Sequence, residues 1–165
     1  MSYEREIRNA SSIYDLFSIV KEIVGEYTGI ERLNTEIVFS ELGFYENGFI
    51  GALYHPYSNT IAINTSPLRK IVQRYPSLVK YYLFHLLLHE YIHALGISNE
   101  IKTRKLAHTI SKKYFGEKHI LTRLSINMKS IFYEERENFD DFFNEIDRIF
   151  SMIRLLTNNL YRDFY

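Results

Sequence analysis

The stretch from His85 to Gly96, HLLLHEYIHALG, contains three histidines at four-residue intervals and one glutamate. On an α-helix, His89 and His93 stand about 6 Å apart along the axis and on the same face, so their imidazoles can bind one zinc ion at about 2.0–2.1 Å each. Glu90 is rotated by about 100° from His89, outside the reach of that ion but within reach of water on it. This spacing predicts a hydrolytic site, in which the ion activates water and polarises a carbonyl while Glu90 accepts a proton.

The residues around this motif are apolar on nearly every side of the predicted helix. Such a helix is buried on several sides, and buried imidazole and carboxylate groups need partners. A metal ion would satisfy them together, whereas the alternative is a core helix whose histidines make ordinary hydrogen bonds. His85 continues the spacing but lies about 12 Å along the axis from His93, too far to share an ion. We therefore expect His85 to pack in the core or to support the ligands.

A catalytic zinc site needs a third protein ligand and one open position. The chain contains no cysteine, so this ligand must be a histidine or a carboxylate. Glu100 is the preferred candidate, because a chain reversal at Gly96 would bring the first turn of the next helix towards His93. Glu100 could instead favour its helix N-terminus or pair with Arg104 at the i+4 position. The alternative third ligand is His119, which follows a predicted helix end on a loop and is otherwise expected to be a solvated side chain.

The elements that must position these residues follow from the hydrophobic periods of the chain. Strand signals follow a first helix, and the chain reads as helical from about residue 66 onward. Together these patterns predict one α+β domain with a small antiparallel sheet and a buried helix that carries the motif. In order, we expect a helix at 11–28, strands at 35–40, 49–54 and 60–64, helices at 66–73, 77–95 and 99–115, a helix or loop at 120–132, and a last helix from about 134 to 156.

Length and composition limit the classes of protein that need to be considered. The 165 residues suit a single domain with a real core, which 14 tyrosines and 12 phenylalanines would enlarge. The 20 basic residues balance 20 acidic ones, which argues against a protein that binds nucleic acid by neutralising phosphates. No apolar run approaches about 18 residues, and the first residues are too polar for a signal peptide. We therefore expect a cytoplasmic protein that does not bind membranes.

The segment His89-Glu90-Tyr91-Ile92-His93 resembles the HExxH signature of the zincin metallopeptidases. The predicted helices and strands over about 11–119 also resemble a minimal zincin fold, with 120–165 as a helical extension, and small archaeal and viral minigluzincins are the nearest group. The resemblance implies a zinc-dependent metallopeptidase that hydrolyses peptide bonds through a zinc-bound water activated by Glu90. Its ligands to one zinc ion would be His89, His93 and Glu100, since Asn99-Glu100 resembles the Asn-Glu of gluzincins. The resemblance further implies that a peptide or protein substrate pairs with an edge strand at 60–64 or its hairpin partner.

Two other functions remain open from the sequence. The first is a non-catalytic structural or regulatory zinc-binding protein, in which His119 closes the site as a fourth ligand and leaves no place for water. The second is an interaction module without metal, whose aromatic residues between Phe139 and Phe150 form part of a helix that contacts a partner or a second copy. The sequence does not indicate the substrate or the oligomeric state.

Overall fold

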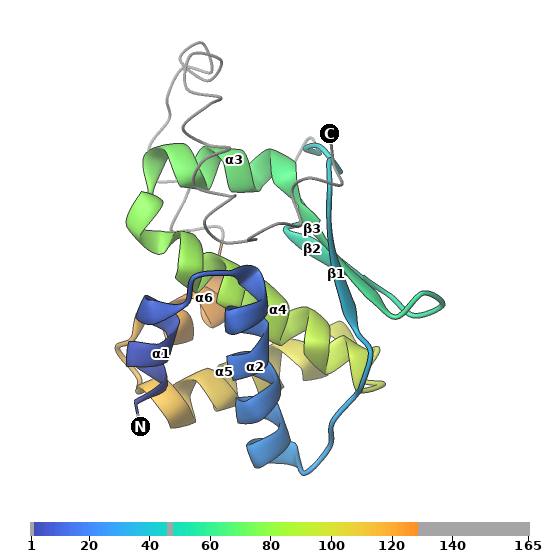
Figure 1. Ribbon diagram of the computed structural model, residues 1–165, viewed down its shortest axis with the longest axis vertical. Helices are drawn as coiled ribbons and strands as arrows, with labels where there is room; N and C mark the ends of the chain where they lie inside the picture. Colours follow the sequence, from blue (N-terminus) through green and yellow to red (C-terminus); the bar gives the residue numbers. More distant parts are fainter. Residues whose placement is uncertain (1, 46–47, 129–165) are drawn as a thin grey trace.

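A computed structural model of the chain describes residues 2–45 and 48–128 (Figure 1). The described part is mixed α+β, with helices packed around a small three-stranded sheet, so the predicted class is confirmed. The predicted helix at 134–156 lies outside the described residues. The elements are α1 (Tyr3–Asn9), α2 (Ile13–Thr28), β1 (Glu36–Ser40), β2 (Ala52–His55), β3 (Thr60–Asn64), α3 (Thr65–Arg74), the 3-10 turn η1 (Pro76–Leu78), α4 (Val79–Ala94), α5 (Glu100–Phe115) and α6 (Ile120–Asn127).

Local signals in the sequence explain where the two helices beside α4 begin and end. In α2, the Ser12 hydroxyl accepts a hydrogen bond from the Asp15 amide at 3.1 Å, and the Asp15 carboxylate accepts from the Ser12 amide at 3.0 Å. This capping box satisfies two helix-terminal donors, and Gly29 ends the helix in the left-handed region with φ of 72°. In α5, the Asn99 side chain accepts from the Lys102 amide at 2.9 Å.

The sheet has the order β1-β3-β2, with β3 in the centre. β2 pairs antiparallel to β3, but β1 pairs parallel to β3 in the register Glu36↔Thr60. The prediction of an antiparallel sheet is therefore wrong for β1. Hydrophobic alternation marks strands but does not give their directions, which depend on the path of the chain between β1 and the β2–β3 hairpin. Of the two candidate edge strands, β3 is central, and its hairpin partner β2 lies at an edge.

A buried asparagine fixes the path of the chain around the end of the sheet. Asn64 is fully buried, and its Oδ1 accepts from the amides of Leu42 at 3.0 Å and Ser66 at 3.1 Å. Its Nδ2 donates to the carbonyls of Gly43 at 3.0 Å and Ile50 at 2.7 Å. One side-chain amide thus uses both of its donors and both acceptor positions to join β3, the start of α3 and the connection between β1 and β2.

Helix α4 lies at the centre of the fold, with the strands on one side of it and α5 and α6 on the other (Figure 1). Twelve of its sixteen residues are buried, as its apolar sequence predicts. The backbone before β2 approaches this helix closely, since a Cβ atom on Gly51 would lie 2.7 Å from Leu86 Cδ2 and 3.0 Å from the Tyr82 hydroxyl. Within the described residues, no helix has the length and apolar character needed to cross a membrane.

Candidate metal centre

The motif residues on α4 meet the first turn of α5. Gly96, with φ of 99°, allows the chain to reverse after α4, so that Glu100 returns towards both histidines. The Glu100 Oε1 atom lies 3.1 Å from His89 Nε2, and Oε2 lies 3.1 Å from His93 Nε2. One ligand atom from each of the three residues lies within 4.8 Å of the others. His89, His93 and Glu100 therefore form a group that could hold a metal ion.

The hydrogen bonds of His93 leave no proton between a neutral His93 ring and Glu100. His93 Nδ1 lies 2.7 Å from the Ile97 carbonyl oxygen, and because that oxygen can only accept, Nδ1 is the donor. The Nε2 atom of a neutral ring then carries a bare lone pair, and it faces Glu100 Oε2, which is also an acceptor. Two acceptors at 3.1 Å need a proton or a metal cation to join them.

The spacing of the donor atoms is compatible with one bound metal ion. In a tetrahedral zinc site with bonds of about 2.0–2.1 Å, neighbouring ligand atoms lie about 3.3 Å apart. Both distances from a histidine Nε2 to a Glu100 oxygen are 3.1 Å. Two imidazoles and one carboxylate are ligands that several divalent first-row metals accept. The side chain of Glu100 is 51% exposed, so the group is open to solvent on one side.

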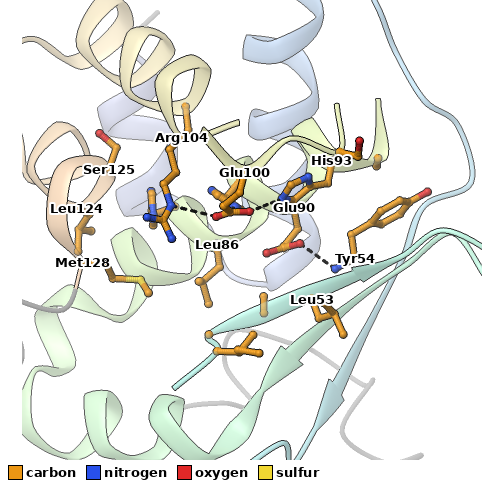
Figure 2. Close-up of a pocket in the computed structure, with 18 of the residues that line it drawn as sticks. Leu53, Tyr54, Leu86, Glu90, His93, Glu100, Arg104, Leu124, Ser125 and Met128 are labelled. Carbon is orange, nitrogen blue, oxygen red and sulfur yellow. Dashed lines mark hydrogen bonds and ion pairs between the residues drawn. The ribbon is translucent and has the colours of Figure 1, made fainter. Parts of the chain in front are cut away.

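Glu90 lies next to this group in a buried position. Its Oε2 atom accepts a hydrogen bond from the Tyr54 amide of β2 at 2.8 Å (Figure 2). Burial raises the pKa of Glu90 to about 8, while the Tyr54 amide acts in the opposite direction and Glu100 adds to the rise. The residue is therefore a carboxyl group that exchanges a proton near neutral pH, placed beside three potential metal ligands.

Two residues of the potential metal-binding group, His89 and Glu100, also have shifted pKa values. Burial lowers the pKa of His89 below its ordinary value, against the attraction of the Glu100 carboxylate. Burial acts to raise the pKa of Glu100, but the neighbouring His89, Arg104 and His93 outweigh it and hold that pKa below its ordinary range. At neutral pH, these shifts favour an ionised carboxylate and a neutral His89 imidazole, which are the forms that bind metals.

A cavity of about 900 Å³ opens onto the group. One wall is β2, including Leu53 and Tyr54, and the opposite wall includes Leu124 and Met128 from α6 and its C-terminus (Figure 2). His85 also lines the cavity, one turn of α4 before His89, but it does not belong to the potential metal-binding group. Burial lowers the pKa of His85 to about 3, so its ring is neutral, in keeping with a packing role.

The structure does not bring His119 to this group. His119 Nε2 lies 2.8 Å from Glu4 Oε2, and its Nδ1 accepts a hydrogen bond from the Leu121 amide at 3.2 Å, which caps α6. The ring also stacks on Phe115, with the centroids 5.1 Å apart. Both nitrogen atoms of His119 are thus engaged in joining α1 to α6.

Sequence reasoning missed the contact between Tyr54 and Glu90. It depends on the strand position of an amide group, and no pattern in the sequence reports it. The sequence indicates Arg104 only as a possible i+4 partner of Glu100. The structure confirms that ion pair, with Arg104 Nε 3.0 Å from Glu100 Oε1. Arg104 also lines the cavity, which its position in the sequence does not reveal.

Comparisons of the chain with protein-family models, with curated proteins and with solved structures give no match. The resemblance to zincins therefore depends on the HExxH segment and on the order of the surrounding elements.

Proposed function

We propose that the chain is a zinc-dependent metallopeptidase with a zincin-like fold. The observation that carries this proposal is the convergence of His89, His93 and Glu100 in an open cavity, with the buried Glu90 carboxyl group beside them. Zinc bound by this donor set would polarise a peptide carbonyl and lower the pKa of water. The three side chains would hold the ion, and their count leaves a position open for the substrate.

Glu90 acts as the general base and then as the general acid. Its carboxylate takes a proton from the water whose oxygen attacks the peptide carbonyl carbon, and it gives that proton to the amine nitrogen as the C–N bond breaks. Burial raises the pKa of Glu90 in the metal-free protein, and a cation held beside it would favour the carboxylate form that the first step needs. The products are one carboxylic acid and one amine.

Strand β2 offers the place where an extended substrate would bind. It is an edge strand, and it forms one wall of the cavity beside Glu90. Gly51 and Asn64 share a backbone hydrogen bond of 2.9 Å, and in an antiparallel pair such bonds alternate. The amide and carbonyl groups of Ala52 therefore face away from β3 and can pair with a peptide by strand addition.

The alternative expectation, a closed structural or regulatory zinc site, needs a fourth protein ligand. Within residues 2–45 and 48–128, the potential metal-binding group contains three residues, and His119 is held by Glu4. An open position favours catalysis over a purely structural role.

Metal analysis combined with an activity assay tests the proposal. We expect protein purified without chelator to contain about one equivalent of zinc and to cleave a generic peptide mixture. Treatment with chelator should abolish cleavage, and stoichiometric zinc should restore it. A protein that carries zinc but cleaves no peptide would argue for a structural or regulatory role, and a protein without bound metal would contradict the metal centre itself.

A further inference from the structure

The charged groups in the cavity wall bear on which peptides the proposed site would take. Two arginines line the cavity, Arg32 and Arg104. Arg32 is already engaged, because its Nε donates to Asn59 Oδ1 at 2.9 Å and its Nη1 donates to the Ala94 carbonyl at 3.2 Å. Arg32 therefore ties the β2–β3 hairpin to the C-terminal end of α4 and has a structural task.

Arg104 is placed differently. Its Nε donates to Glu100 Oε1 at 3.0 Å, and the same oxygen lies 3.1 Å from His89 Nε2. The guanidinium group is thus adjacent to the candidate metal centre, and Figure 2 shows it beside Glu100 on the side of the pocket where Leu124 lies.

Most of the hydrogen-bonding capacity of Arg104 remains unused. A guanidinium group has five N–H donors, of which the Nε–H contacts Glu100. In the part of the chain that the structure describes, the N–H groups on Nη1 and Nη2 have no hydrogen-bond partner, and the side chain is 69% exposed. A planar pair of N–H donors is suited to bind a carboxylate through two parallel hydrogen bonds.

Much of the cavity wall around Arg104 is aliphatic. Leu86 of α4, Leu124 of α6 and Met128 line this side together with the polar Ser125, so a ligand there meets a cation and aliphatic surface. The final residue of a peptide combines a carboxylate with a side chain on the same Cα atom. A peptide whose last residue has an apolar side chain would therefore satisfy both features of this side of the cavity.

We propose that Arg104 binds the terminal carboxylate of the substrate, so that the enzyme releases an apolar residue from the free C-terminus of a peptide. This inference rests on the proposed function. Successive carbonyl carbons of a peptide lie about one residue apart, roughly 3.3–3.8 Å. Because Arg104 Nε and His89 Nε2 lie 3.0 Å and 3.1 Å from the same Glu100 oxygen, the guanidinium is separated from the proposed metal centre by one carboxylate oxygen, a distance on the order of one residue step. Water adds its hydroxyl to the penultimate carbonyl carbon, and the last residue leaves as a free amino acid.

Two matched peptides test this inference, N-acetyl-Gly-Gly-Leu and its C-terminal amide. We expect kcat/KM of the parent protein to be at least about tenfold higher for the acid, since hydrogen bonds to charged groups are the stronger ones. Arg104→Gln should bring the ratio of the two kcat/KM values close to one, and Arg104→Lys should leave an intermediate ratio. Lys105→Gln, an exposed change of one positive charge on the same helix, is the control and should keep the parent ratio.

A binding measurement separates this inference from the proposed function. Calorimetry with the zinc-loaded Glu90→Gln protein reports affinity for both peptides without cleavage, and zinc content is measured in parallel. Tighter binding of the acid that disappears in the Glu90→Gln, Arg104→Gln protein supports the assignment of Arg104 as the residue that binds the terminal carboxylate, even if the parent cleaves neither peptide and the proposed function fails. Equal affinities for acid and amide, or an acid preference that survives Arg104→Gln, would overturn it.

Discussion

Within residues 2–45 and 48–128, histidine and glutamate side chains meet at two places, and their hydrogen bonding differs. Where α1 meets α6, His119 Nδ1 accepts from the Leu121 amide, so a neutral ring carries its proton on Nε2 and donates it to Glu4 at 2.8 Å. Between α4 and α5, His93 Nδ1 donates to Ile97, so the neutral ring turns an acceptor towards Glu100 at 3.1 Å. The first contact is complete in itself, whereas the second needs an additional proton or a metal ion between its two acceptors.

Residue types alone therefore do not identify a metal centre. A single imidazole between a carboxylate and a helix terminus connects two helices. A pair of imidazoles one helical turn apart faces the same carboxylate through both Nε2 atoms, and the Nε2 atom of a neutral His93 has no proton to donate to it. The carboxyl group of Glu90 beside that pair has no counterpart in the contact between His119 and Glu4.

The largest effect is expected from Glu90→Gln, which keeps the shape of the centre and removes its general base. Hydrolysis of a generic peptide mixture should fall about 10²–10⁴-fold, the usual contribution of a positioned acid–base group, while the zinc content stays at one equivalent. Steady-state kinetics and elemental analysis of the same preparation measure both quantities. Glu117→Gln, an exposed change remote from the cavity, serves as the control. Hydrolysis at the parent rate by Glu90→Gln would refute the assigned mechanism.

The next-largest effect is expected on zinc affinity when the two histidines, His93 and His119, are each replaced by alanine. His93→Ala should weaken zinc binding by at least about a hundredfold, because loss of a supporting group alone commonly costs 10–100-fold. His119→Ala should leave zinc affinity unchanged, since this ring contacts Glu4. Competition with a chromophoric chelator measures both dissociation constants. If His119→Ala weakened zinc binding as much as His93→Ala, the sequence alternative with His119 as a ligand would regain support.

The third prediction concerns the stability of the metal-free protein as pH changes. Burial raises the pKa of Glu90 to about 8 in the folded protein, so the folded state holds this proton when the unfolded state has released it. The stability that Glu90 contributes should therefore fall as pH rises from about 5 to 8, by on the order of 4 kcal/mol, while the lowered pKa values of His85 and His89 act in the opposite direction below about pH 6.5 in both proteins. Urea unfolding of chelator-treated parent and Glu90→Gln protein measures the difference. Parallel pH profiles for the two proteins would show that the carboxyl group is not buried in this way.

The smallest effect is expected at the contact between His119 and Glu4, where α1 meets α6. Glu4→Ala removes the carboxylate that accepts hydrogen bonds from His119 at 2.8 Å and from Tyr81 at 2.6 Å. The side chains are partly buried, so the free energy of unfolding should fall by about 1 kcal/mol with no change in zinc affinity. Thermal unfolding of the zinc-free protein is the measurement. A change in zinc content on Glu4→Ala would mean that the two sites are coupled.

The sequence anticipates features that depend on local spacing. His89 and His93 share a helix face because helical geometry requires it, and the Gly96 reversal places Glu100 where the first turn of α5 is expected. The helix at 11–28 is close to α2 because its capping residues are local signals. Each of these features involves residues that lie within about a dozen positions of one another.

Features that depend on distant pairings were not predictable in the same way. The parallel direction of β1 joins strands that start at Glu36 and Thr60, and neither strand carries a signal for its partner's direction. The position of His119 depends on Glu4, a residue of α1, and this helix of seven residues buries only Ile7. A short helix with one buried side chain has too weak a hydrophobic period to be recognised.

The hydrogen bond from the Tyr54 amide to Glu90 couples the edge of the sheet to the carboxyl group. An amide carries one hydrogen, so the amide of Tyr54 can serve Glu90 or a peptide aligned along β2, but it cannot satisfy both fully. A ligand that takes this hydrogen deprives the carboxylate of the donor that lowers its pKa. Occupancy of the strand edge and the basicity of Glu90 are therefore thermodynamically linked, and each must change when the other does.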